Sequence, residues 1–295
     1  MKILVGQYHL NSIGGTETFT YTLVKELVRQ GHFVDLITFV PGFLSNMLEQ
    51  ETGIPTNVIR ESHYDIALVN HNIVVDKIRS LGVVENIIQT CHGIIPNLEF
   101  PTNNANKHIA ISKEIEDNIN EKGFTNTEII LNGIDCNRFN PVITLNSRIR
   151  NIVSLSQSES ANTTLSIVCN LLGCNLITFN KNTNPTFAIE KFINQGDLVV
   201  GLGRSAYDAI ACGRPVFVWD ERDYQGNLGD GYLTVDNFDD FAINNCSGRR
   251  NKKVYTPELI AKEILENYNS NDMSNYRQLA LDKLNIEKQV QKYLL

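Results

Sequence analysis

The stretch DLVVGLGRSAYDAIACGRPVFVWD, residues 197–220, carries the strongest structural signal in the chain. It begins and ends with continuous apolar runs, which predict two buried strands. Between the runs, Gly201 and Gly203 favour a turn into a helix, and Gly213 favours the end of that helix. A strand, a helix and a second buried strand in this order are typical of a parallel α/β sheet. The two expected strands cover residues 197–202 and 215–219.

The same stretch predicts a binding site. The glycines leave the backbone open, and the N–H groups at the amino terminus of a helix attract anions. The Arg204 guanidinium could bind a phosphate through two parallel hydrogen bonds. Asp208, one helical turn further along, could accept hydrogen bonds from a ribose. The alternative is an ordinary surface ion pair between Arg204 and Asp208. The expected binding set here is Gly203, Arg204, Ser205, Ala206 and Asp208.

Outward from this stretch, short apolar runs alternate with helical patterns along most of the chain. Several runs are continuously hydrophobic, which indicates parallel strands covered on both faces. One helix is expected over 17–31, with Thr16 as a possible cap and Gly31 at its end. The fold class expected from this alternation is α/β. The remaining expected strands are 2–6, 33–39, 65–70, 86–91, 108–111, 128–132, 151–156 and 175–179.

The alternation is interrupted once, by a polar segment without periodicity near 141–150. We therefore expect a linker there, with one α/β half over 1–145 and a second over 146–275. The last 40 or so residues differ, since they form two or three amphipathic helical patterns.

Composition limits the possible functions. The chain has 295 residues, 42% hydrophobic and 20% charged, which is enough to build a large core. Its net charge of −7 disfavours non-specific binding to DNA or anionic lipid, although a local basic groove remains possible. No apolar run approaches the ~20 residues that cross a bilayer, and the amino terminus has the pattern of a buried strand rather than a signal peptide. Six scattered cysteines without a CxxC pair favour free thiols, so we expect a cytoplasmic protein.

Two motifs in the first half are candidates for ligand contact. SIGGTE, residues 12–17, places Gly14 and Gly15 between the first strand and its helix, where the backbone could approach a ligand. It lacks the GxGxxG pattern of dinucleotide-binding proteins, and a purely structural turn is the alternative. His92 follows a buried strand at the end where open α/β sheets bind ligands, so it could contact a hydroxyl or a phosphate. A structural histidine is the alternative.

Together these segments resemble the GT-B glycosyltransferases, specifically the large retaining group-1 family. The resemblance covers nearly the whole chain in the right order. Its most specific part is GRSAYDAIACGRP, which is similar to the GRSALEAMACGRP variant of the donor-site helix, and the following stretch at 226–250 resembles that variant too. The other matching segments are IGGTE, TCHG, AISKEIEDNI and NGIDCNRFNP.

The resemblance implies two Rossmann-like domains facing a cleft, with the nucleotide-sugar donor mainly on the second and the acceptor mainly on the first. The final helix, 276–295, would cross back to the first domain. Asp208 takes the place of the family's ribose-binding glutamate, and His92 would line the sugar site. The glycine loop, with Gly14, Gly15 and Thr16, would contact the donor.

Three departures from the family pattern concern charge. Val200 stands where a first glutamate would touch the donor sugar. Gln157 stands where the family has a diphosphate-binding arginine, and Ala161 or Asn162 stands where it has a lysine. Because a leaving diphosphate needs electrostatic stabilisation, either Arg204 substitutes, another basic residue reaches in, or catalysis is poor.

The resemblance predicts a retaining hexosyl- or pentosyltransferase that uses a nucleotide diphosphate sugar such as a UDP or GDP sugar. His92 and Arg204 are the expected catalytic residues, and Gln157 is included among the donor-binding positions. No metal or further cofactor is expected, because no DxD motif follows a strand. The acceptor is open: a glycan, a lipid, a protein or a modified nucleobase. The alternatives are a nucleotide-sugar epimerase or hydrolase and a catalytically impaired nucleotide-sugar binding protein, whereas the absent GxGxxG disfavours a dehydrogenase.

Overall fold

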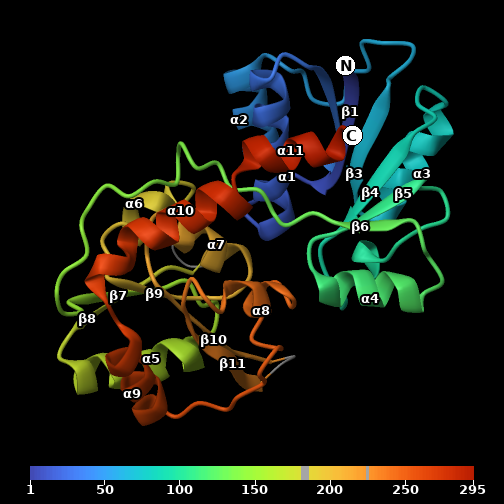
Figure 1. The fold of residues 1–295 in the computed structure, drawn as a ribbon. Coiled ribbons are helices and arrows are strands. Elements are labelled where there is room, and N and C mark those ends of the chain that lie inside the picture. The colour runs from blue at the N-terminus through green and yellow to red at the C-terminus, as the bar shows by residue number, and fades with distance from the viewer. Residues whose placement is uncertain (181–185, 224–225) are drawn as a thin grey trace. The chain divides into compact units, whose positions relative to one another are not determined.

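The computed structural model describes residues 1–180, 186–223 and 226–295 (Figure 1). These residues form two compact units. The first consists of Met1–Gly133 together with Ile286–Leu295, and the second of Ile134–Asn285. The chain therefore passes between the units after Gly133 and again after Asn285, and the polar segment at 141–150 lies inside the second unit.

The first unit, all of whose residues are described, contains a six-stranded sheet in the order β2-β1-β3-β4-β5-β6. Every neighbouring pair is parallel, which agrees with the continuous apolar runs in the sequence. The strands are β1 Lys2–His9, β2 Phe33–Val40, β3 Ile66–Asn70, β4 Ile87–Cys91, β5 Lys107–Ala110 and β6 Thr127–Ile129. Because β1, β3 and β4 are adjacent, their carboxyl ends bring distant parts of the sequence together at one edge.

Helices cover this sheet. The helix after β1 begins at Gly15, and its N-cap is the extended residue Gly14, so the expected cap at Thr16 is wrong: Thr16 already lies inside the helix. The last helix packs against the first (Figure 1). The Arg29 guanidinium lies 2.5 Å from the Glu287 carboxylate. The helical segments are α1 Gly15–Arg29, α2 Phe43–Thr52, α3 Asn72–Leu81, η1 Asn97–Glu99, α4 Lys113–Glu121 and α11 Ile286–Tyr293.

The described part of the second unit contains a five-stranded sheet in the order β11-β10-β9-β7-β8. Its first four strands in sequence are parallel, whereas β11 is an antiparallel edge strand. The sequence did not predict β11, because its glycines are rare in strands. Gly229 is required there, since a Cβ would lie 2.8 Å from the Val218 carbonyl oxygen. The strands are β7 Asn151–Ser154, β8 Asn175–Thr178, β9 Leu198–Val200, β10 Val216–Arg222 and β11 Gly226–Leu233.

The core of the second unit joins strand and helix side chains. Trp219 and Phe217 from β10 pack with Leu165 and Ile260 from two helices, and all four are fully buried. The helical segments are α5 Glu159–Leu172, α6 Ile189–Ile193, α7 Arg204–Ala211, α8 Phe238–Ala242, α9 Pro257–Asn267, η2 Ser270–Asp272 and α10 Met273–Lys283. The expected α/β architecture is therefore confirmed in both units.

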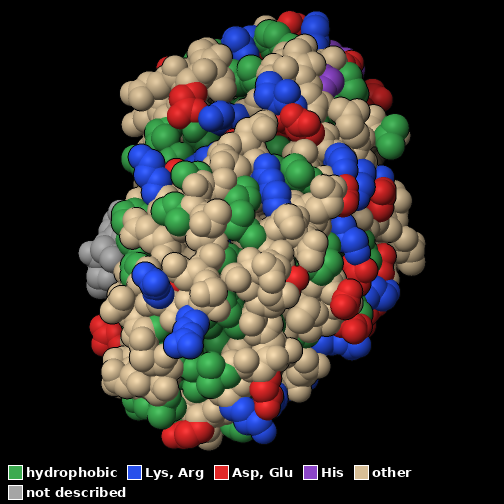
Figure 2. Space-filling model, turned by 60° about the vertical axis from the view of Figure 1, so that its left-hand side comes forward, with side chains coloured by type: hydrophobic (Ala, Val, Ile, Leu, Met, Phe, Trp, Pro, Cys, Tyr) green, Lys and Arg blue, Asp and Glu red, His purple; other side chains and the backbone are tan. Residues whose placement is uncertain are grey.

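The surface shows no charge field of a single sign on the face drawn in Figure 2, where basic and acidic side chains are interspersed. Among the described residues, no helix is both long and apolar enough to cross a membrane.

Candidate functional site

The glycine loop of the first unit carries a carboxylate. The Glu17 side chain folds back over Gly14, so that a Cβ on Gly14 would overlap with it, whereas a Cβ on Gly15 would meet no atom within 4 Å. The Thr16 hydroxyl lies 3.2 Å from Glu17 Oε2 and donates to it. A carboxylate repels phosphate and accepts hydrogen bonds from hydroxyls. The loop therefore suits a hydroxyl-bearing ligand better than a phosphate.

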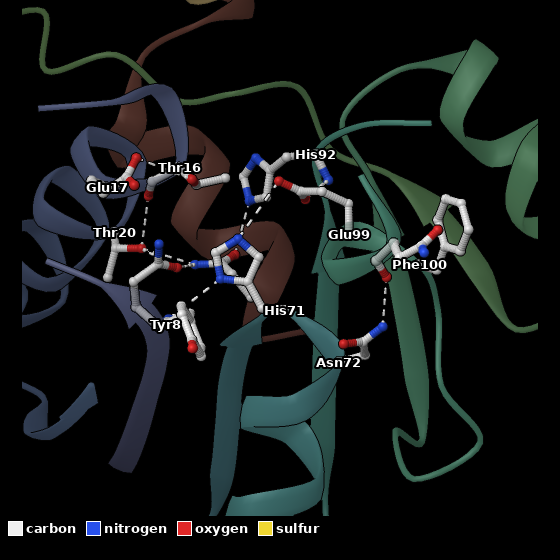
Figure 3. A network of polar contacts seen from close by, with 12 residues as sticks. Tyr8, Thr16, Glu17, Thr20, His71, Asn72, His92, Glu99 and Phe100 are labelled. Atoms are coloured by element: carbon white, nitrogen blue, oxygen red, sulfur yellow. Dashed lines mark hydrogen bonds and ion pairs between the residues drawn. The ribbon is translucent and has the colours of Figure 1, made fainter. Parts of the chain in front are cut away.

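His92 follows β4 and is held by both its ring and its backbone (Figure 3). Its Nε2 lies 2.8 Å from Asn70 Oδ1, and its backbone N–H donates to Glu99 Oε2 over 3.0 Å. The ring also packs edge-on against Phe19, with centroids 4.7 Å apart. The imidazole thus occupies a defined position at the carboxyl edge of the sheet.

Asn70 connects His92 to the buried interior. It is the last residue of β3, and its Nδ2 donates to Gln7 Oε1 over 2.9 Å and to Thr20 Oγ1 over 2.8 Å. Gln7 lies on β1 and Thr20 on α1, and all three side chains are buried. Sequence analysis missed this network, although the position of Asn70 at a strand end was a usable signal.

His71 and Glu99 form a second pair beside His92 (Figure 3). The Tyr8 backbone N–H donates to His71 Nδ1 over 3.3 Å, which leaves the imidazole proton on Nε2, 3.6 Å from Glu99 Oε1. Burial raises the pKa of Glu99, but the imidazoles of His71 and His92 outweigh burial and leave that pKa below its ordinary value. Glu99 is therefore a carboxylate at neutral pH. Neither residue of this pair was predicted from the sequence.

In the second unit, the turn before α7 depends on a glycine with a positive φ. Gly203 has φ +59° and ψ −127°, a conformation that other residues rarely adopt, and its N–H donates to the Cys246 carbonyl over 2.9 Å. The N–H groups of Ser205 and Ala206, expected to face an anion, donate to loop carbonyls over 3.3 and 3.0 Å. A bound anion would have to share these donors or rely on the Arg204 side chain.

Arg204 and Asp208 form an ion pair on α7. The Arg204 Nε lies 3.8 Å from Asp208 Oδ1, and each side chain is only 11% exposed, so the pair is buried rather than on the surface. Burial raises the pKa of Asp208 to about 6, against the opposing effect of Arg204 and Arg138. Burial also lowers the pKa of Arg204. Among the described residues, Asp208 Oδ1 has no hydrogen-bond partner, so it can accept from a ligand hydroxyl.

A second ion pair lies close to the first. The Arg138 Nε and Nη2 are 3.1 and 2.9 Å from Glu190 Oε2, and the guanidinium stacks 4.0 Å from the Phe187 ring centroid. Arg138 belongs to NGIDCNRFNP, one of the segments that resemble the glycosyltransferase family, but no role was predicted for this arginine. Its charge acts on both Arg204 and Asp208.

The positions that depart from the family pattern carry no compensating charge. Val200 is buried on β9, and Ala161 is buried in α5. The Gln157 side chain donates to the Leu155 carbonyl over 3.1 Å, and Asn162 Oδ1 accepts from a serine hydroxyl over 2.6 Å. These side chains stabilise their own loop and helix.

Arg222, which sequence analysis missed, brings a cation to this loop. The Arg222 Nε donates to Asp220 Oδ2 over 2.7 Å, and the same carboxylate accepts from the Ser156 hydroxyl. Ser156 directly precedes Gln157. Arg222 is therefore tied to the loop in which the family's arginine is missing. Over residues 1–180, 186–223 and 226–295, no cluster of three or more His, Cys, Asp or Glu is arranged to hold a metal ion.

Comparison with known proteins shows what the fold is similar to. No family model and no curated protein sequence matches the chain. HepE from Anabaena, solved in complex with UDP and glucose, is 14% identical with a TM-score of 0.65 and covers 100% of this chain and 98% of its own. A glycosyltransferase from Rickettsia africae is 15% identical with a TM-score of 0.65, covering 99% and 96%.

A third similar structure is an α-glucosyltransferase in complex with UDP and a 13-mer DNA containing an HMU base. It is 10% identical with a TM-score of 0.60, and the match covers 100% of this chain and 98% of that one. At such identities the likeness shows the fold alone. It confirms the GT-B glycosyltransferase fold, while membership of the group-1 variant stays a prediction.

Proposed function

We propose that this chain is a glycosyltransferase that transfers a sugar from a nucleotide diphosphate sugar to an acceptor hydroxyl with retention of configuration. The observation that carries the proposal is the buried Arg204–Asp208 pair at the start of α7, in which Asp208 Oδ1 accepts no hydrogen bond from any described residue. A mostly buried arginine can bind a phosphate, and a carboxylate one helical turn away can accept hydrogen bonds from a ribose. HepE, which has the same fold, was solved with UDP and glucose.

In the proposed complex, Asp208 Oδ1 accepts from a ribose hydroxyl and Arg204 faces the diphosphate. Arg222 adds positive charge next to the Gln157 loop. These cations would stabilise the leaving diphosphate without a metal ion, and metal-independent transfer is part of the proposal. UDP is the nucleotide we would test first, because two similar structures contain it.

The first unit would contact the sugar. His92, Glu17 and Glu99 offer hydrogen bonds to hydroxyls, and the carboxylates disfavour a phosphate there. His92 then orients the donor sugar, and the leaving phosphate accepts the acceptor's proton, as the family resemblance implies. The proposal leaves the acceptor class open.

A second candidate is a nucleotide-sugar binding protein without turnover. Buried Val200 and neutral Gln157 favour it, since they remove two of the three charges that the family pattern contains. An epimerase or hydrolase would differ from a transferase by releasing nucleotide without any dependence on an acceptor.

A thermal-shift screen of UDP, GDP and their sugars, followed by a nucleotide-release assay, separates these functions. A ligand at 100 times its dissociation constant stabilises the fold by about 2.7 kcal/mol. We expect stabilisation by one nucleoside diphosphate, and release that rises when a suitable acceptor is added. Stabilisation without release would favour the binding protein, and no stabilisation by any nucleotide would contradict the proposal. Asp208→Asn is the matched control, since it keeps the shape and removes the carboxylate.

A further inference from the structure

The position of the proton on His92 can be worked out from the buried network around Asn70. Both ring nitrogens of an imidazole can carry the proton, and the choice decides which nitrogen accepts a hydrogen bond. His92 Nε2 lies 2.8 Å from one end of the Asn70 side-chain amide. The question is therefore which end of that amide, the oxygen or the nitrogen, faces the ring.

The backbone carbonyl of Thr16 determines which end of the Asn70 amide faces the ring. The Thr20 hydroxyl lies 2.9 Å from the Thr16 carbonyl oxygen, one turn earlier in α1, and a carbonyl can only accept. Thr20 Oγ1 also lies 3.3 Å from Gln7 Oε1, so the single hydroxyl proton of Thr20 is directed at one of these two oxygens, the nearer being that of Thr16. The Asn70 atom 2.8 Å from Thr20 Oγ1 must then be the donor, which is Nδ2.

The remaining contacts follow from this orientation. The second proton on Asn70 Nδ2 goes to Gln7 Oε1, 2.9 Å away, and Oδ1 is left to face His92. An amide oxygen accepts only, so His92 Nε2 must carry a hydrogen. Asn70 is 2% exposed, and Thr20 and Gln7 are 0% exposed, so water cannot replace a lost partner. Turning the Asn70 amide would remove the donor from both Gln7 Oε1 and Thr20 Oγ1.

We propose that Asn70 is a positioning residue that holds His92 in the tautomer with hydrogen on Nε2, so that Nδ1 is the acceptor nitrogen of the neutral ring. Figure 3 shows the second ring nitrogen of His92 directed away from the dashed bond that joins Nε2 to the network. An acceptor nitrogen in a fixed place binds a sugar hydroxyl as a donor and holds the sugar in one orientation. This last step rests on the proposed function, whereas the tautomer does not.

Nitrogen-15 NMR of the histidine side chains tests the tautomer without any assay of activity. In the unmodified protein, at a pH where His92 is neutral, we expect its hydrogen on Nε2. In Asn70→Leu, of similar size but without an amide, we expect a mixture of tautomers. Thr20→Val, which keeps the shape and removes only the anchoring hydroxyl, should give a smaller shift in the same direction. His108, which is buried on β5 and contacts the Thr102 carbonyl, is the internal control and should keep its resonances.

Kinetics add a readout that a purely structural role would not change. In Asn70→Leu we expect kcat to fall about 10- to 100-fold, as a misplaced sugar predicts, with the affinity for UDP unchanged. Hydrogen on His92 Nδ1 in the unmodified protein, or an unchanged tautomer in Asn70→Leu with His108 undisturbed, would overturn the proposal. An unmodified protein with the expected tautomer and no transfer would instead contradict the proposed function.

Discussion

The polar side chains around His92 in the first unit differ from the Arg204–Asp208 pair on α7 of the second unit in the chemical groups that they offer to a ligand. Around His92, a neutral amide network and two carboxylates, Glu17 and Glu99, present hydrogen-bond acceptors. Around Asp208, the mostly buried Arg204 and the partly exposed Arg138 add positive charge, and Asp208 Oδ1 accepts no hydrogen bond from the residues that the structure describes. The first set suits hydroxyls, and the second suits phosphate and ribose. Under the proposed function, sugar recognition therefore belongs to the first unit and nucleotide recognition to the second.

Removing Arg204 should have the largest effect. Loss of a cation that stabilises charge on a leaving group costs roughly 100- to 1000-fold in turnover, so Arg204→Ala should lose that much. Arg204→Lys keeps the charge but not the forked geometry, so its turnover should lie between that of Arg204→Ala and that of the unmodified protein. Steady-state kinetics of both variants give the comparison. Arg250→Ala, which removes an exposed arginine 3.8 Å from Asp240, is the control, and equal loss in that variant would remove the special role of Arg204.

His92→Ala should come next. A donor sugar misplaced by about 1 Å can cost about 100-fold in rate, so turnover should fall by that order. UDP affinity, measured by calorimetry, should stay the same because the proposed nucleotide contacts lie in the other unit. A parallel loss of affinity and turnover would break the division between the two sites.

Asp208 should control nucleotide affinity and its pH dependence. Removing a charged hydrogen-bond partner in Asp208→Ala should weaken UDP binding by about 1.5–3 kcal/mol. Because the pKa of Asp208 is raised to about 6, the carboxylate becomes protonated as the pH falls through 6, and affinity should decline there. Calorimetry over pH 5 to 8 should show this decline in the unmodified protein and a flat profile in Asp208→Asn.

The same shift predicts an effect on stability. The folded state binds a proton at Asp208 more tightly than the unfolded state, so the free energy of unfolding should decrease as the pH rises from about 4 to 6. Above pH 6 the charged Asp208 remains a destabilising group. Asp208→Asn should therefore unfold at a higher temperature than the unmodified protein at pH 7. A lower melting temperature would show that the ion pair with Arg204 outweighs the cost of burial.

Restoring a missing charge should have the smallest effect. Gln157→Arg places a cation in the loop already connected to Arg222, and a partly exposed charge contact contributes up to about 1 kcal/mol. UDP affinity should rise by about fivefold or less, and Gln157→Glu should lower it. If Gln157→Arg leaves affinity unchanged while Gln157→Glu also does nothing, the loop does not face the diphosphate.

The sequence predicted the parallel strands well because each is a continuous apolar run between turn signals. It missed β11, whose three glycines lower its strand propensity while Gly229 is needed for close packing beside Val218. It placed a cap at Thr16 because threonine commonly caps helices, but the extended Gly14 takes that role. These errors arise where tertiary contacts override local preference.

The candidate site was foreseen only in part. Arg204, Asp208 and His92 stand in motifs, so their spacing pointed to them. Asn70 and Glu99 could not be found in that way, because their roles depend on strand order and on a loop that returns to His92. Burial of the Arg204–Asp208 pair also depends on packing around α7, which single-residue spacing does not report.

Hydrogen–deuterium exchange of the full chain, with and without saturating UDP, tests the division between the two sites most directly. UDP lacks the transferred sugar that would contact His92, so we expect the strongest added protection in peptides covering residues 201–208. Peptides covering 12–20 should change much less. Protection concentrated at 12–20 with none at 201–208 would contradict the assignment of the nucleotide to the second unit.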